Sequence, residues 1–232
     1  MNSNTEESER HSRLRDAETK AAKLFEEAER RGLIRAGISE KTLNTEMYDL
    51  ALEMYGIKKY WHKRIVRSGA NTVHPYRENP PDLMIQDDDI LFFDFGPVFE
   101  DWEADFGRTY VLGNDPLKLK IQREIEEAWQ LGKKHYDQTP DITGAQLFNF
   151  IIGLAEARGW KFPQAHCGHL IGSFPHERIQ GDEYLNYIHP DNQTKMRDSD
   201  QNGKPKDWIL EIHFVDQQRQ LGGFFEQLLT VE

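Results

Sequence analysis

The spacing of apolar residues along the chain first predicts helices. In the charged segment from about Glu6 to Arg31, apolar residues recur at three- and four-residue steps from Leu14 to Ala28. This spacing predicts an amphipathic helix. A second helix is expected to begin at Ser39 or slightly later at Thr42, which can serve as N-caps, and to end at Gly56.

Further along, short apolar runs rich in β-branched and aromatic residues predict strands, and two longer amphipathic stretches predict helices. We expect the strands at Ile57–Arg67, Ile90–Phe99, Asp105–Leu112, Trp208–Asp216 and Gly223–Val231, and the helices at Pro116–Tyr136 and Thr143–Ala157. The acidic stretch Gly181–Lys206 contains few apolar residues and is expected to be a surface loop.

Length and composition are those of one enzyme-sized domain. A chain of 232 residues buries roughly 70% of its unfolded surface. We expect one catalytic domain over 1–232, with a helical segment at 1–56 and a core at 57–232. No apolar run approaches the roughly 20 residues that a membrane helix needs, so membrane insertion is not expected.

The net charge of −11 repels phosphate backbones, and no basic face interleaved with aromatic residues offsets it. Nucleic-acid binding is therefore disfavoured. Cys167 is the only cysteine, and the start of the chain has no secretory or transit pattern. We expect a cytoplasmic protein, and a homodimer is left open.

Five residues stand out because each is set in an apolar, strand-like run, where a charge is costly unless it is compensated. These are Asp94, Asp105, His169, Glu211 and Glu226. A pair of divalent metal ions would supply the compensation. We refer to this set as the five predicted ligands.

Asp94 and Asp105 are the sharpest pair among them. A hairpin whose turn centres on Phe99 and Glu100 would place the two carboxylates directly opposite each other, where like charges repel unless a cation lies between them. The alternative is that one aspartate caps a turn and the other pairs with Arg108.

His169 lies between glycines in an apolar segment, where a neutral imidazole would be a good metal ligand. A lone buried histidine is more often a core residue, although His166 and His176 nearby favour a site. Glu211 and Glu226 are acids at strand spacing, and for each one the alternative is an edge-strand charge. We interpret Cys167 as a small buried residue rather than a nucleophile.

The order and spacing of these residues resemble the M24 metallopeptidases, from about Ser68 onward. The resemblance depends on Asp94 and Asp105 with Gly-Arg-Thr following, on the segment Gly168–Gly172 with His176, and on Glu211 and Glu226. It implies an α+β pita-bread fold, a curved antiparallel sheet with flanking helices, here with extra N-terminal helices. It also implies that the five predicted ligands hold two divalent ions, that Glu211 shuttles a proton, and that His176 steadies a carbonyl oxygen.

The chain departs from the family pattern at three places. Tyr76 stands where the family usually has a substrate-facing histidine, and His74 lies two residues earlier, so either could take that role. Ile212 replaces a common proline, and phenylalanines replace an arginine before the last glutamate. These differences leave specificity open.

The leading hypothesis is a dinuclear metal-dependent aminopeptidase, using two ions of Mn, Co, Fe or Zn, that hydrolyses the N-terminal bond of a peptide substrate. Xaa-Pro bonds are among the candidates. The alternative is a module that binds a peptide or small molecule and keeps the fold without turnover. A creatinase-like hydrolase of a non-peptide C–N bond comes third.

Overall fold

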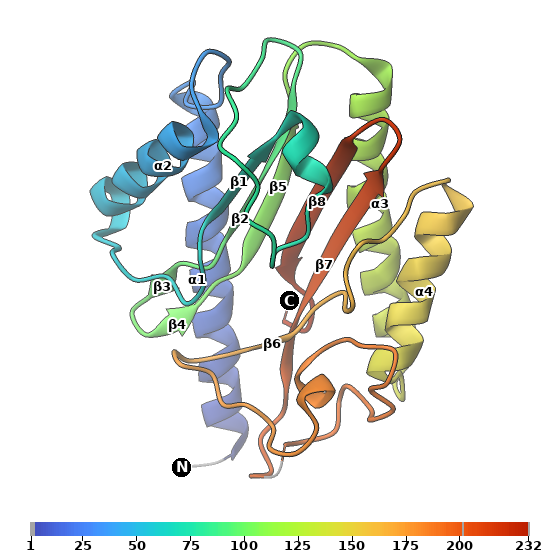
Figure 1. Cartoon of the computed structure of the whole chain (residues 1–232). Helices are drawn as coiled ribbons and strands as arrows, with labels where there is room; N and C mark the ends of the chain where they lie inside the picture. Colours follow the sequence, from blue (N-terminus) through green and yellow to red (C-terminus); the bar gives the residue numbers. More distant parts are fainter. Residues whose placement is uncertain (1–2, 201, 232) are drawn as a thin grey trace.

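The computed structural model describes residues 3–200 and 202–231. Its main sheet is antiparallel, with six strands in the order β1-β2-β5-β8-β7-β6. Figure 1 shows the helices packed against one side of this curled sheet. The strands are β1 (Ile65–Ser68), β2 (Ile90–Phe95), β5 (Phe106–Val111), β6 (Leu170–Ile171), β7 (Asp207–Asp216) and β8 (Leu221–Leu228), and a separate small hairpin is formed by β3 (Val98–Phe99) and β4 (Trp102–Glu103).

The four predicted helices are confirmed. They are α1 (Ser3–Arg30), α2 (Glu40–Tyr55), α3 (Pro116–Gln138) and α4 (Gly144–Ala157), and two short 3₁₀ helices lie at Gly69–Val73 and Glu183–Asn186. The Ser39 side chain accepts from Thr42 N at the start of α2, and Gly56 ends that helix at φ 68°. Thr143 and Gln146 form a capping box at the start of α4, so these boundaries follow from local chemistry.

Side chains alternate between the two faces of the sheet, which separates the core from the site. On β2, Phe93 and Phe95 point into a core made with α1 and α2. On β7, Trp208 and Leu210 point into a second core made with α3 and α4. The alternate residues, Asp94 on β2 and Glu211 on β7, therefore point to the opposite face.

Two predicted strands differ from the structure. Of the segment predicted as a strand at Ile57–Arg67, only its last residues join the sheet, in β1. The residues before it bond instead to the chain after β2, with Trp61 N donating to Gly96 O at 2.9 Å and Val98 N to Lys59 O at 3.1 Å. The strand predicted at Gly223–Val231 lies two to three residues earlier, as β8, because it pairs with β7 from Asp216↔Leu221 to Ile209↔Leu228.

The predicted register of the Asp94 hairpin is wrong by two residues. Asp94 lies opposite Gly107 rather than Asp105. The turn is a two-residue connection at Glu100 and Asp101, both with positive φ. Such a turn fits the right-handed twist of the strands, and it places the centre of the hairpin one residue later than expected.

Helix α1 contacts strands β7 and β8 through polar side chains. Arg10 and His11 contact Asp207 at the start of β7, the histidine at 3.4 Å. The Glu18 carboxylate accepts from Leu228 N of β8 at 3.2 Å. Burial raises the pKa of Glu18 to about 7, although the bond from Leu228 and the charge of Arg108 oppose the shift.

We expect Glu18→Gln to stabilise the protein at alkaline pH. Because the folded-state pKa is above the unfolded value, Glu18's contribution to stability is fully present below the unfolded pKa and is lost as pH rises through about 7. The variant should therefore match the wild type near pH 4 and gain roughly 1 to 3 kcal/mol of unfolding free energy at about pH 8.5. Urea unfolding at both pH values measures this.

The exposed Glu9→Gln on the same helix is the control, and it should change stability little at either pH. An effect of Glu18→Gln that is the same at both pH values would contradict the prediction.

Candidate metal centre

Three carboxylates form one row across this opposite face of the sheet. Asp94 on β2 lies opposite Gly107 on β5, Gly107 lies opposite Glu226 on β8, and Glu226 lies opposite Glu211 on β7. The directly opposed pair of acids is therefore Glu211 and Glu226. Like charges in that arrangement repel unless a cation is bound between them.

Gly107 allows the Phe224 ring to lie against the middle of this row. A Cβ at this position would clash with the Phe224 ring and come within 3.0 Å of the Glu226 Cβ. Glycine is therefore needed here, because the Phe224 ring occupies the space that a side chain would fill.

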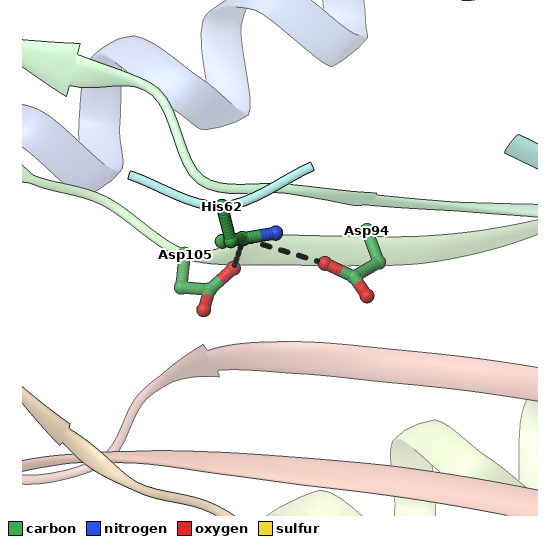
Figure 2. Close-up of side chains that lie close together, drawn as sticks. All are labelled: His62, Asp94 and Asp105. Carbon is green, nitrogen blue, oxygen red and sulfur yellow. Dashed lines mark hydrogen bonds and ion pairs between the residues drawn. The ribbon is translucent and has the colours of Figure 1, made fainter. Parts of the chain in front are cut away.

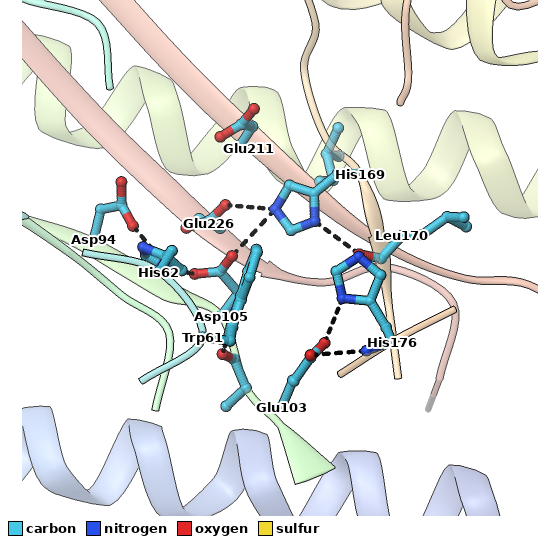
Figure 3. A network of polar contacts seen from close by, with 12 residues as sticks. Trp61, His62, Asp94, Glu103, Asp105, His169, Leu170, His176, Glu211 and Glu226 are labelled. Atoms are coloured by element: carbon cyan, nitrogen blue, oxygen red, sulfur yellow. Dashed lines mark hydrogen bonds and ion pairs between the residues drawn. The ribbon is translucent and has the colours of Figure 1, made fainter. Parts of the chain in front are cut away.

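Asp105, just before β5, connects the row to two histidines (Figure 3). Its Oδ1 lies 3.1 Å from Nε2 of His62, and its Oδ2 lies 3.1 Å from Nε2 of His169. Nε2 of His169 is also 3.7 Å from Oε1 of Glu226. All five predicted ligands thus converge on one site.

Backbone contacts explain how His169 reaches this position. Cys167 O and His169 O accept from Glu211 N and Ile209 N of β7, at 3.0 and 2.9 Å. Gly168 between them has φ 150°, and a Cβ there would clash with the Ile209 carbonyl. The glycine therefore allows the histidine loop to lie directly against β7.

The electrostatics of the site show a shortage of positive charge. Burial and the nearby Asp105 charge raise the pKa of Glu226 well above its usual value. Burial raises the pKa of Asp94 to about 7, although His62 opposes the shift. Burial also acts to raise the pKa of Asp105, but His62 and His169 outweigh it and hold that pKa below its usual range.

The donor set fits divalent metal ions. The site contains two groups of three ligand atoms, and within each group the atoms lie within 4.8 Å of one another. One group is His62, Asp94 and Asp105, and the other is Asp105, His169 and Glu226. Among the described residues, Oε2 of Glu226 is buried without a hydrogen-bond partner. Buried acceptors of this kind need a cation, and oxygen with imidazole donors suits Mn, Fe, Co or Zn.

The alternatives considered from sequence find no support at the two aspartates. Arg108 lies on the other face of β5, where it donates to Glu226 O at 2.9 Å and packs against the rings of Phe106 and Phe225. Cys167 is fully buried, and burial raises the pKa of its thiol, as expected for a packing residue rather than a nucleophile.

The three other candidate residues lie around this cluster at different positions. Nδ1 of His176 donates to Oε2 of Glu103 at 2.7 Å, and its ring packs against Trp61. The Tyr76 ring packs edge-on against His62, with centroids 5.7 Å apart. His74 instead pairs through Nδ1 with Glu78, so of the two alternatives Tyr76 is the one beside the ligands.

Sequence analysis missed His62, Trp61 and Glu103. His62 stands between Trp61 and Lys63 in a basic segment that resembled an ordinary strand. Glu103 is 1% exposed and follows a hairpin turn, where an acid usually faces solvent. The sequence shows that His62 adjoins the aromatic residue Trp61, but this does not indicate which distant residues His62 contacts.

Comparisons with known proteins agree with this geometry. The family model described as metallopeptidase family M24 matches residues 12–201. A putative Xaa-Pro aminopeptidase of Mycoplasma pneumoniae is 26% identical over 148 residues, which make up 62% of this chain and 41% of that protein. The chain therefore spans less than half the length of this curated relative.

Two solved structures have a similar fold. A dipeptidase from Pyrococcus horikoshii superposes with a TM-score of 0.76 at 23% identity, covering 94% of this chain and 56% of that chain. A methionine aminopeptidase from Rickettsia prowazekii superposes with a TM-score of 0.71 at 14% identity, covering 97% and 94%.

The curled antiparallel sheet, its helices on one face and its buried acids on the other define a pita-bread protein of the α+β class. The chain belongs to the metallopeptidase family M24. No helix in the described part of the chain is long and apolar enough to cross a membrane.

Proposed function

We propose that this protein is a dinuclear metal-dependent aminopeptidase that hydrolyses the N-terminal peptide bond of peptides. The observation that carries the proposal is the convergence of the five predicted ligands, from five separate segments, on one buried site. Acids gathered in this way are costly to bury without bound cations.

Divalent ions bound there would polarise the scissile carbonyl and lower the pKa of a water molecule towards neutrality. The protein's own groups would supply the remaining steps. Glu211, whose Oε1 lies 2.8 Å from Nδ1 of His166, would accept a proton and pass it to the departing amine. His176, oriented through Nδ1 by Glu103, would donate from Nε2 in its imidazolium form as charge develops on the carbonyl oxygen.

For substrate class, we propose short peptides with a free N-terminus, with Xaa-Pro bonds as the first to test. The relatives named as an Xaa-Pro aminopeptidase and a dipeptidase support this choice. Tyr76, 38% exposed and beside His62, is proposed to contact the substrate in place of a histidine. We also propose that 1–232 acts as one catalytic domain, with the ligands in 57–232 and a helical cover in 1–56.

A second candidate is a peptide-binding module that keeps the fold but catalyses no hydrolysis. Tyr76 and Ile212, where the chain departs from the family pattern, would favour it. The retention and convergence of all five predicted ligands favours the enzyme. A cytoplasmic location and a homodimer remain predictions from sequence.

We expect chelation to abolish cleavage and metal to restore it. The protein should be dialysed against a chelator, checked by elemental analysis, and reconstituted separately with Mn, Co, Fe or Zn. Release of the first residue from short peptides, including Xaa-Pro peptides, should require metal. It should stop when the N-terminus is acetylated, because the free amine is then lost.

Full cleavage by the protein shown to be metal-free would contradict the aminopeptidase proposal. Tight binding of the free peptides without cleavage under every metal would favour the binding module instead.

A further inference from the structure

We propose that His62 is a metal ligand, with its Nε2 binding an ion held between Asp94 and Asp105. This inference rests on the metal centre of the proposed function and adds a donor to it. His62 is not among the five predicted ligands, so the residue pattern that identifies the family does not account for it.

The geometry of the three side chains carries the proposal (Figure 2). Nε2 of His62 lies 3.1 Å from Oδ1 of Asp105 and 3.6 Å from Oδ1 of Asp94. The three ligand atoms lie within 4.8 Å of one another, and the His62 side chain is only 8% exposed. An ion placed among them would bind two carboxylate oxygens and one imidazole nitrogen.

The hydrogen bond at the other ring nitrogen leaves Nε2 available. Nδ1 of His62 is 2.8 Å from Lys63 O, and since a carbonyl can only accept, Nδ1 carries the proton. In the neutral form that binds a metal, the lone pair of the ring is then on Nε2. Metal-binding histidines usually donate their second N–H to a carbonyl or carboxylate in this way.

His169 has the same arrangement, with Nδ1 2.9 Å from Leu170 O and Nε2 directed at Asp105. Each histidine thus faces one of the two carboxylate oxygens of Asp105. In each case the carbonyl of the next residue accepts from Nδ1 and so fixes the tautomer. Asp105 would bridge the two ions, with one imidazole on each.

Contacts of Trp61 and Gly96 hold His62 in place. The backbone of Trp61 bonds to Gly96 O, and Nε1 of Trp61 donates to Ala104 O at 3.0 Å. A Cβ at Gly96 would clash with the rings of both His62 and Trp61. Glycine at the end of β2 therefore lets the imidazole reach the aspartates.

Oε2 of Glu226, which is buried and has no hydrogen-bond partner among the described residues, points independently to a bound cation in this cluster. An imidazole on the ion beside Asp94 would also change which metal this part of the site prefers. A site of oxygen donors alone suits Mn, whereas an added nitrogen favours Co, Fe or Zn.

Cobalt(II) provides a direct test without any peptide. A cobalt-bound histidine that keeps its Nδ1–H gives one exchangeable proton signal shifted far outside the usual NMR range by the paramagnetic ion. Full-length protein loaded with two equivalents should show two such signals. His62→Gln should remove one and His169→Gln the other, while titration calorimetry should show one cobalt site weakened by more than roughly 10 to 100-fold.

His213→Gln is the matched control. His213 is also buried, but its Nε2 bonds to Thr72 O at 2.8 Å, so this variant should keep both signals. If His62→Gln does not fold, the number of shifted proton signals in the wild-type protein still tests the inference.

One signal in the wild type, or two signals that both survive in His62→Gln, would overturn the inference and leave the aminopeptidase proposal standing. Two assigned signals in a protein that cleaves no peptide would support His62 as a ligand while the proposed function fails.

Discussion

Asp105→Asn should reduce kcat/KM by at least about 10³-fold, because metal binding supplies several kcal/mol of transition-state stabilisation. Both carboxylate oxygens of Asp105 are in use, one facing His62 and the other His169. Asparagine keeps one oxygen and turns an amide NH₂ towards the remaining histidine, so one ion loses a ligand. Elemental analysis after gel filtration should show fewer than two metal equivalents.

Asp101→Asn is the control for this change. Asp101 is exposed at the hairpin tip with φ 69°, a conformation that asparagine tolerates, so metal content and activity should stay at wild-type levels. Unchanged metal content and peptidase activity in Asp105→Asn would rule out Asp105 as a bridging ligand.

Glu211→Gln should have the second-largest effect, a fall in kcat of about 10² to 10⁴-fold at saturating metal. Glutamine preserves the shape and one ligand oxygen but cannot accept a proton. The other four predicted ligands remain, so metal content should change less than it does in Asp105→Asn. Initial rates at saturating peptide, together with metal analysis of the same sample, separate the two effects.

The exposed Glu177→Gln, whose carboxylate pairs with Lys204 at the surface, is the matched control and should keep wild-type kcat. If Glu211→Gln retained wild-type kcat, the proton would have to travel by another group. His166 would then be the first to examine, since its Nδ1 lies 2.8 Å from Oε1 of Glu211.

The helices could be predicted from sequence because their signals are local. The Ser39 cap and the Gly56 ending of α2 need only neighbouring residues, and the same is true of the Thr143 capping box. The acids of the site could be selected for a related reason, since a charge in an apolar strand is visible in a short window. Their convergence followed from the family resemblance rather than from the residues.

The register of the hairpin could not be predicted, because it depends on the conformation of two particular residues. Glu100 and Asp101 adopt positive φ, although neither is glycine. The ladder shifts by two, so side chains keep their face of the sheet but Asp94 acquires a different partner. The face of Asp94 was predicted correctly because a shift of two residues does not change it. The residue opposite Asp94 was predicted wrongly because the same shift does change it.

His62 could not be found because its environment is assembled by long-range contacts. The histidine is 43 positions from Asp105, and it reaches the aspartates only because the segment before β1 bonds to the chain after β2. Propensity and periodicity describe neither contact.

The bond between Glu18 of α1 and Leu228 of β8 spans 210 positions. On the ribosome, α1 emerges long before β8, so Leu14, which packs with Ile171, Ile209 and Leu228, stays uncovered while most of the chain is still being made. Loop closure over such a distance is slow, and exposed apolar stripes associate in the meantime. Nascent chains of this protein should therefore depend on chaperone protection for much of their synthesis.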